Sequence, residues 1–419
     1  MRIAVFTNRF PSRISTFFAR DMRALINAGL DIDIFAFYPL EPELWCYVPD
    51  LLNAAALPRT KIHHISITES LQCAVSLNGT LQTIFREIPG ILCSAAKFGP
   101  RRFVKTVYVL LKALAWSRLY NGVHYDQILA YWGNYAATCA YVFHRLSDQS
   151  IPFSMFLHAG MDLYEGHVYM KEKLLYSDNL IVVCDFNRQF LREQYTEIFP
   201  LISPRIYKYH LGLDLETFPY QPDGRAHLKI LAVGALEKYK GFDYLLRAGR
   251  HLSDRGVNYE IELIGDGPEE NFLKRLADEL NIREKVRFLG WLPFHDVRTA
   301  MSQATILVHP SNGVADAVPT VIKEAMALGL PVIASNIAGI PELLDEGRCG
   351  ILVPPRDPKE LANAIERLLT HEALRLRYAD AARQYADEIF DLWRNGRRLA
   401  DLLRSTTRVS GKGRLPIRI

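Results

Sequence analysis

The stretch KILAVGALEKYKGFDYLLRAGRHL, residues 229–252, contains the unit that decides the fold. Its first five residues, Lys229–Val233, are apolar apart from the lysine and predict a strand. After a loop, apolar residues recur at helical spacing over Phe242–Leu252, which predicts a helix. A second strand is expected at Glu260–Ile264. A strand, a helix and a strand in this order are typical of a parallel sheet covered by helices.

The alternation extends through both halves of the chain. The other strands predicted in the second half are Val286–Leu289, Thr305–His309 and Pro331–Ala334. The other helices predicted there are Glu269–Leu280, His295–Ser302, Thr320–Leu328 and Lys359–Leu369. The strands predicted in the first half are Ile3–Phe6, Ile32–Phe37, Gln127–Tyr131, Phe153–Leu157 and Leu180–Val183, with a helix at Phe17–Ala28. Because the pattern occurs twice, the predicted fold class is α/β, with two Rossmann-like domains facing across a cleft.

The domain boundaries follow from length and from one linker. A chain of 419 residues fits two domains of about 200 residues each. The sequence PYQPD at Pro219–Asp223 predicts the linker, so domains are expected over 1–218 and 224–382. A helix over 383–404 and a basic tail over 405–419 follow. Ligands of such sheets bind beyond the carboxyl ends of the strands, so the site is expected between the two domains.

The composition excludes several classes of protein. With 49% apolar and 23% charged residues the chain is typical of globular proteins. A formal net charge of +4, without a recognisable module, argues against a nucleic-acid partner. The six cysteines lack C-x-x-C spacing, which favours a reducing compartment over a zinc site or disulfide scaffold. Met1–Phe6 is too short for a signal peptide, and no apolar run suits a membrane span, so a cytoplasmic location is expected.

Two segments interrupt the alternation and are rich in basic residues. Residues 81–118 contain seven basic residues and one acid, Glu87. A helix over 101–118 would place Arg101, Lys105 and Lys112 on one face and apolar residues on the other. This pattern fits the surface of an anionic membrane, and equally a domain helix with a solvated basic face. The tail after Leu403 is basic as well and predicts a disordered electrostatic tether, so peripheral attachment to the inner face of the membrane is one expectation.

The segment DAVPTVIKE, residues 316–324, connects a predicted strand to a predicted helix. The start of that helix, near Thr320, offers backbone N–H groups and the positive end of the helix dipole, which suit a phosphate. Asp316 and Glu324 flank this position, and their carboxylates suit sugar hydroxyls better than a phosphate. An ordinary strand-to-helix turn with surface acids would give the same local pattern.

Further short motifs follow one another along the chain. In the second half they are Val233-Gly234, Lys240-Gly241, Gly265-Asp266-Gly267-Pro268, Phe288-Leu289-Gly290, Pro310-Ser311, Val318-Pro319, Glu324-Ala325-Met326-Ala327, Gly339-Ile340-Pro341-Glu342 and Gly350-Ile351-Leu352-Val353-Pro354. In the first half they are Phe10-Pro11, Thr16-Phe17, Arg20, His158-Ala159 with Asp162, Phe186-Asn187-Arg188 and Gly212-Leu213-Asp214. With these motifs the sequence, over about residues 1–400, resembles the retaining family 4 glycosyltransferases of GT-B fold. Its first half is similar to their exopolysaccharide, colanic-acid-type branch.

The resemblance implies an activity and a donor site. Such enzymes move a sugar, with retention, from a UDP- or GDP-sugar to a hydroxyl of a glycan or lipid-linked acceptor, with no cofactor or metal. Lys240 would neutralise the diphosphate, Glu324 would hold the ribose, and Asp316 would be the first acid of the pair. The other donor-binding positions implied are Lys238, Gly265, Gly267, Leu289, Val318, Pro319, Thr320 and Val321.

The resemblance also implies an acceptor side. His158 would lie near the reaction centre, and the other positions implied there are Asn8, Arg9, Thr16 and Asp162. The helix around Phe390 and Trp393 would cross back onto the N-terminal domain.

Three positions depart from the family pattern. Asp316 stands where the family usually has Glu, Ala235 where it commonly has Arg, and Ile14-Ser15 where this branch usually has Ser-Glu. Lys238 is near enough in sequence to substitute for the missing Arg. Ala235 and Asp316 leave open a catalytically impaired, nucleotide-sugar-binding subunit, and Ile14-Ser15 leaves the identity of the acceptor open. A different enzyme on the same double-Rossmann plan, such as a nucleotide-sugar epimerase or a phosphorylase, is a separate alternative. An oxidoreductase is disfavoured because no G-x-G-x-x-G follows the first strand.

Overall fold

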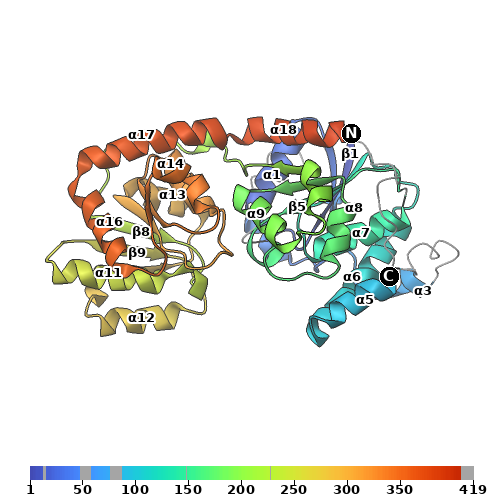
Figure 1. Cartoon of the computed structure of the whole chain (residues 1–419), viewed down its shortest axis with the longest axis horizontal. Helices are drawn as coiled ribbons and strands as arrows, with labels where there is room; N and C mark the ends of the chain where they lie inside the picture. Colours follow the sequence, from blue (N-terminus) through green and yellow to red (C-terminus); the bar gives the residue numbers. More distant parts are fainter. Residues whose placement is uncertain (13–15, 48–57, 76–86, 148, 227, 407–419) are drawn as a thin grey trace. The chain divides into compact units, whose positions relative to one another are not determined.

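The computed structural model describes residues 1–12, 16–47, 58–75, 87–147, 149–226 and 228–406. The chain folds into two compact units. The N-terminal unit comprises Met1–Gly212 together with the helix that begins at Leu392, and the C-terminal unit comprises Leu213–Asp391. Each unit is built on a parallel β-sheet flanked by helices (Figure 1).

The sheet of the N-terminal unit has seven described strands in the order β3-β2-β1-β4-β5-β6-β7. They are β1 (Arg2–Thr7), β2 (Asp31–Ala36), β3 (Ile62–His63), β4 (Gln127–Ala130), β5 (Phe153–Leu157), β6 (Asn179–Val182) and β7 (Ile206–Lys208). All neighbouring pairs are parallel. The chain adds β2 and β3 on one side of β1 and then returns to add β4 on the other. The switch between β1 and β4 is where ligands of such sheets bind, beyond the strand ends.

Helices cover both faces of this sheet because successive strand residues point to opposite sides. Ala4 and Phe6 of β1 join a core that α5, α6, α7 and α8 cover. On α18, Gly396 packs so closely on Ala24 of α1 that a side chain would overlap it, and Asn395 Nδ2 donates to the His210 carbonyl at 3.0 Å. The last described helix therefore crosses back onto the N-terminal unit. The helices are α1 (Thr16–Asn27), α3 (Ile67–Val75), α5 (Ile88–Ala96), α6 (Pro100–Leu119), α7 (Tyr135–Leu146), α8 (Met170–Tyr176), α9 (Asp185–Gln194), α10 (Phe199–Ile202) and α18 (Leu392–Ser405).

The sheet of the C-terminal unit has six described strands in the order β10-β9-β8-β11-β12-β13. They are β8 (Lys229–Val233), β9 (Glu260–Ile264), β10 (Val286–Gly290), β11 (Ile306–His309), β12 (Val332–Ser335) and β13 (Ile351–Val353). Ile230 and Ala232 face a core with α11, α12 and α16, and Leu231 faces a second core with α13, α14 and α17. The helices are α11 (Phe242–Asp254), α12 (Glu270–Glu279), α13 (Phe294–Gln303), α14 (Thr320–Ala327), α15 (Ile340–Leu343), α16 (Pro358–Thr370) and α17 (Glu372–Ile389).

The boundary between the units lies before the predicted linker, at Gly212 and Leu213. Leu213 donates its N–H to the Phe390 carbonyl at 2.7 Å, and Phe218 is buried in the second core of the C-terminal unit. Residues 213–218 therefore belong to the C-terminal unit, as do residues 383–391. The helix that crosses back begins at Leu392, not at 383, because α17 and Phe390 pack in the C-terminal unit.

The basic face predicted for 101–118 is wrong at Lys112. This side chain is fully buried in α6, and its ammonium donates to the Ile65 carbonyl. Burial lowers the pKa of Lys112 to about 8. On the opposite side, Leu110 and Leu114 are buried in the protein while Val104 is exposed. Of the tail predicted over 405–419, Ser405 belongs to α18, and residues 407–419 lie outside the described residues.

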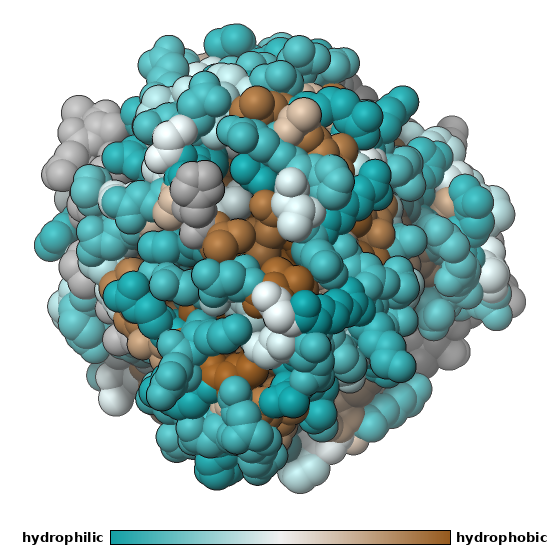
Figure 2. Space-filling model, turned by 90° about the vertical axis from the view of Figure 1, so that its left-hand side faces the viewer, coloured by the Kyte–Doolittle hydropathy of each residue, from teal (hydrophilic) through white to brown (hydrophobic). Residues whose placement is uncertain are grey.

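The surface drawn in Figure 2 is mainly hydrophilic, with hydrophobic residues in separated patches. Amphipathic helices produce this pattern because their apolar stripe packs on a sheet and their polar side faces water. None of the described helices is both long enough and apolar enough to span a membrane.

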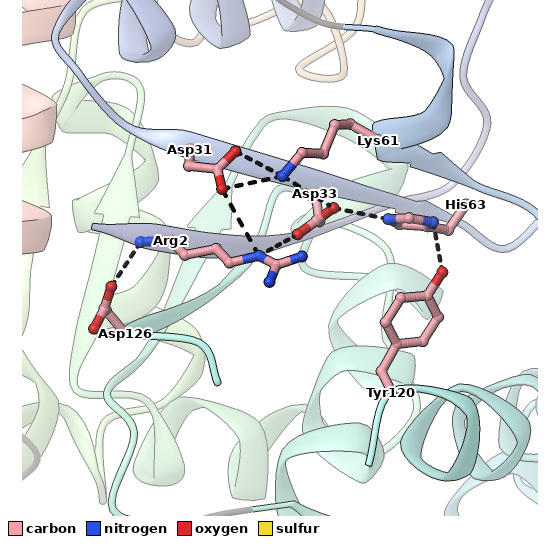
Figure 3. A network of polar contacts seen from close by, with 7 residues as sticks. All are labelled: Arg2, Asp31, Asp33, Lys61, His63, Tyr120 and Asp126. Atoms are coloured by element: carbon pink, nitrogen blue, oxygen red, sulfur yellow. Dashed lines mark hydrogen bonds and ion pairs between the residues drawn. The ribbon is translucent and has the colours of Figure 1, made fainter. Parts of the chain in front are cut away.

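A polar network ties together the amino ends of β1, β2 and β3 (Figure 3). Asp33 is 1% exposed, and its carboxylate accepts from Arg2 Nε at 2.8 Å and lies 2.9 Å from His63 Nε2. Burial alone would raise the pKa of Asp33, but His63, Arg2 and Lys61 hold it at about 2. The network lies at the amino ends of these strands, away from the carboxyl ends where ligands bind. We therefore assign it to the stability of the fold.

Candidate active site

The first feature of the site is the close packing of two loops at the carboxyl end of the C-terminal sheet. Gly265 and Gly267, after β9, both have positive φ, and the loop after β8 lies against them. A Cβ at Gly265 would lie 2.8 Å from the Gly234 carbonyl carbon, and one at Gly267 would lie 2.6 Å from the Leu236 oxygen. Leu236 in turn donates its N–H to the Asp266 carbonyl at 2.8 Å. The two glycines are required because only their lack of a side chain allows this backbone-to-backbone contact.

The central feature is an ion pair between two loops 76 residues apart in sequence. Lys240 ends the short 3₁₀ helix η6 (Lys238–Lys240), and its Nζ donates to Asp316 Oδ2 at 2.8 Å. His309, the last residue of β11, places Nε2 2.6 Å from the same oxygen. Burial alone would raise the pKa of the Asp316 carboxyl, but Lys240 and His309 hold it well below its usual range. Asp316 is therefore a carboxylate fixed in position by two nitrogen donors.

The start of α14, Thr320, lies four residues beyond Asp316. Pro319 precedes the helix, and no side chain caps this helix end in the described structure. Glu324, one turn inside, is 8% exposed. The first turn therefore presents backbone N–H groups and the positive end of the helix dipole next to the ion pair, as an anion requires.

The remaining donor-side positions differ in exposure. Lys238 and Ala235 are exposed, and Pro319 is buried. The partly exposed positions are Leu289, Val318, Thr320 and Val321. The Lys238 carbonyl accepts from Asn312 Nδ2 at 3.2 Å, which fixes the backbone of η6 against the loop after β11.

In the N-terminal unit, His158 directly follows β5 and is 5% exposed. Its ring packs among aromatic side chains, with ring centroids 4.7 Å from Trp132, 4.9 Å from Tyr131 and 5.4 Å from Phe17. Phe17 follows Thr16, the first residue of α1, so the structure brings the start of α1 next to His158. His158 is thus held rigidly at the carboxyl end of the sheet.

Asp162 fixes the loops after β4 and β5 to each other. Its two carboxylate oxygens accept from the backbone N–H of Asn134 at 3.0 Å and of His158 at 2.8 Å. Burial raises the pKa of Asp162 to about 7, and the backbone hydrogen bonds oppose the rise. Asp162 is 2% exposed, so the structure makes it a positioning residue for His158.

The other two acceptor-side predictions, Asn8 and Arg9, follow β1. Asn8 lines a cavity in the N-terminal unit together with Asn134 and His167. Arg9 forms an ion pair with Glu41 and lies over the Tyr38 ring.

Sequence reasoning missed His309 and the cavity. The signal for His309 was present: a polar residue ends an otherwise apolar strand, ILVH, at the edge where ligands bind. The cavity residues come from separate loops and from α6 and α7, so no local pattern marks them.

Comparison with known proteins relates the sequence of this chain to one family. Residues 224–385 match the family of glycosyl transferases group 1. The chain is 27% identical over 417 residues to the amylovoran biosynthesis glycosyltransferase AmsK of Erwinia amylovora, covering 96% of this chain and 99% of that protein. It is 31% identical over 175 residues to the alpha-D-kanosaminyltransferase of Streptomyces kanamyceticus, covering 42% of this chain and 45% of that protein.

Solved structures agree on the fold. HepE (Alr3699) of Anabaena, crystallised in complex with UDP, has a TM-score of 0.68 and 17% identity, covering 96% of this chain and 99% of that chain. The two parallel sheets and the helix that crosses back are those of the GT-B fold. Residues 224–385 therefore belong to the group 1 glycosyl transferases, and the chain is a glycosyltransferase of the GT-B type.

Proposed function

We propose that the protein transfers a sugar, with retention of anomeric configuration, from a UDP- or GDP-sugar to a hydroxyl of a growing cell-surface polysaccharide or lipid-linked glycan. The observation that carries the proposal is the Lys240–Asp316–His309 cluster beside the uncapped start of α14. The AmsK relative is named for amylovoran biosynthesis, and the HepE structure contains UDP, which supports a nucleotide-sugar donor and a polysaccharide product.

Each group has a distinct task in this proposal. Lys240 and the N–H groups of Thr320 and Val321 meet the negative charge that develops on the leaving diphosphate. Glu324 accepts from the ribose hydroxyls. Asp316 uses Oδ2 for Lys240 and His309, so we assign Oδ1 to a hydroxyl of the transferred sugar.

The nucleoside lies beside the loops after β9 and β10. Gly265 and Gly267 do not leave room for it themselves, as the resemblance implied, because the backbone of the loop after β8 fills the space at both glycines. We place Leu289 beside the base. We assign to His158, whose N–H donates to Asp162, a role toward the transferred sugar. The acceptor hydroxyl attacks from the face that the diphosphate leaves, and a phosphate oxygen takes its proton. Because Lys240 and the helix start supply the positive charge, we propose a reaction that needs neither a metal nor a cofactor. It would take place at the cytoplasmic side of the membrane.

Donor binding and turnover are the test. Thermal unfolding of the purified chain is measured with UDP-, GDP- and ADP-sugars, with and without EDTA. A donor at 100 times its Kd stabilises by about 2.7 kcal/mol, so a binding nucleotide class gives a clear shift. A shift that EDTA does not change, followed by hydrolysis of that donor, supports the proposal. Binding without any turnover would instead identify an impaired subunit, in which Ala235 and Asp316 have removed catalysis.

A further inference from the structure

The N-terminal unit contains a cavity of about 380 Å³ at the carboxyl end of its sheet. Asn8 follows β1, Tyr38 follows β2, and Asn134 follows β4, so three adjacent strands open toward it. The first turns of α6 close another side. The other lining residues are Arg101, Arg102, Lys105, Tyr135, Thr138, Glu165, His167 and Val168. The cavity therefore lies at the switch between β1 and β4, where ligands of such sheets bind.

The lining carries an excess of positive charge. Arg102 Nη2 lies 3.3 Å from Glu165 Oε2, so the one acid of the lining is matched by one cation. Among the described residues, Arg101 and Lys105 have no acid within 4.0 Å. Lys105 Nζ instead lies 4.4 Å from the Tyr135 ring centroid and 4.8 Å from the Tyr38 ring centroid. The start of α6 adds the positive end of a 20-residue helix.

Two buried polar atoms also point to a ligand. Within the described part of the chain, Asn8 Oδ1 and His167 Nε2 have no hydrogen-bond partner. A buried polar atom without a partner is unfavourable, and a ligand in the cavity can supply the missing hydrogen bond. Burial, with Lys173 and Arg102 nearby, lowers the pKa of His167 to about 3, which keeps its ring neutral. A glycan hydroxyl can satisfy both atoms, since it donates to one group and accepts from another.

We infer that this cavity binds an anionic part of the acceptor, a phosphate or carboxylate carried on a glycan. Arg101 and Lys105 meet the negative charge, Asn8 and His167 bind hydroxyls, and Tyr38 and Tyr135 offer flat apolar surfaces to a sugar ring. The inference rests on the proposed function for the identity of the ligand as acceptor. It assigns the basic end of α6 to substrate binding.

Calorimetric titration of the full chain tests the inference. The probes are inorganic pyrophosphate, which represents the diphosphate of a lipid carrier, glucuronate, which represents an acid sugar, and neutral glucose. The titrations use the Lys240→Ala background, which removes the cation of the proposed donor site. We compare Arg101→Gln/Lys105→Gln with Lys97→Gln, an exposed lysine outside the cavity, and with Lys105→Arg, which keeps the charge.

We expect pyrophosphate or glucuronate to bind to the background protein. The double variant should bind it about tenfold more weakly or worse, which is the effect of losing at least one charge-assisted hydrogen bond. Lys97→Gln and Lys105→Arg should bind like the background protein. Preference for one anion identifies its source.

Three results would overturn the inference: no binding of either anion, equal binding by the double variant, or equal binding of glucose. Circular dichroism confirms that the variants are folded. A thermal shift with UDP on the Arg101→Gln/Lys105→Gln variant with Lys240 intact judges the proposed function separately, because the cavity has then lost the two cations that would bind a diphosphate.

Discussion

Replacing Lys240 by Met tests the ion pair at the centre of the candidate site. The substitution removes the ammonium that lies 2.8 Å from Asp316 Oδ2 and keeps the apolar part of the side chain. The side chains of Lys240 and Asp316 are 13% and 10% exposed, so the pair is nearer to buried than to surface pairs. Surface pairs contribute about 0.2–1 kcal/mol, and breaking a buried pair costs about 3–5 kcal/mol. We therefore expect a loss of about 2 kcal/mol in the free energy of unfolding.

The assay is a double-mutant cycle. Urea denaturation gives the free energy of unfolding of the wild type, Lys240→Met, Asp316→Asn and the double variant. Because the two groups are in direct contact, the double variant should lose about 1–2 kcal/mol less than the sum of the single variants. Titration of the same proteins with UDP should show that Lys240→Met binds UDP about tenfold more weakly than the wild type, or weaker still, because a charge-assisted hydrogen bond to phosphate is lost.

Additive losses, within about 0.5 kcal/mol, would refute the ion pair. Unchanged UDP affinity in Lys240→Met would refute its role toward the diphosphate. Lys274→Ala on α12 is the control, because it removes a lysine of the same unit that contacts Glu270 and the Phe288 ring rather than Asp316. It should change neither UDP affinity nor stability by more than about 0.5 kcal/mol.

Three further predictions follow from the structure. The pKa of Asp33 is lowered from 3.8 to about 2, so above pH 4 its carboxylate contributes about 2 kcal/mol to the free energy of unfolding, and this contribution is lost as the pH falls through 2. Urea denaturation between pH 5 and 2 should show the loss in the wild type and not in Asp33→Asn. Gly265→Ala should destabilise the protein by about 3 kcal/mol or more, because the new Cβ would overlap the Gly234 carbonyl. Gly290 also has a positive φ but no atom within 4 Å of a Cβ, so Gly290→Ala should cost only about 1 kcal/mol, a difference that thermal unfolding can measure. Asp162→Asn should destabilise by about 1–3 kcal/mol, since one of its two backbone N–H partners loses an acceptor, and Asp162→Glu serves as the comparison that keeps the charge.

The alternation of strands and helices in the sequence predicted both sheets, but not their short strands. Ile62–His63, Ile206–Lys208 and Ile351–Val353 have two or three residues each and lie at sheet edges, where no periodicity can be recognised. The sequence predicts a solvent-exposed Lys112 because it does not show that the carbonyl partner, Ile65, which is 47 residues away, lies next to it. Helical periodicity reports only neighbours within the same helix.

In the candidate site, too, the sequence predicted residues but not the contacts between them. The order of motifs identified Lys240 and Asp316, but their contact depends on β8 and β11 being neighbours in the sheet. His309, on β11, depends on the same pairing of strands, whereas the cavity beside Arg101 depends on β1 lying between β2 and β4 in the other sheet. Residue types could be read from the sequence, whereas partners required the fold.

The position of the unit boundary has a consequence for how the protein can be taken apart. Leu213 and Phe390 are joined by a backbone hydrogen bond, so the C-terminal unit begins and ends at one point. Gly212 and Leu392, the flanking residues of the N-terminal unit, are also in contact. Topologically, residues 213–391 are an insert within a single continuous host. We expect that such a cassette can be exchanged between related enzymes at one pair of adjacent junctions, which under the proposed function would separate the choice of donor from the choice of acceptor.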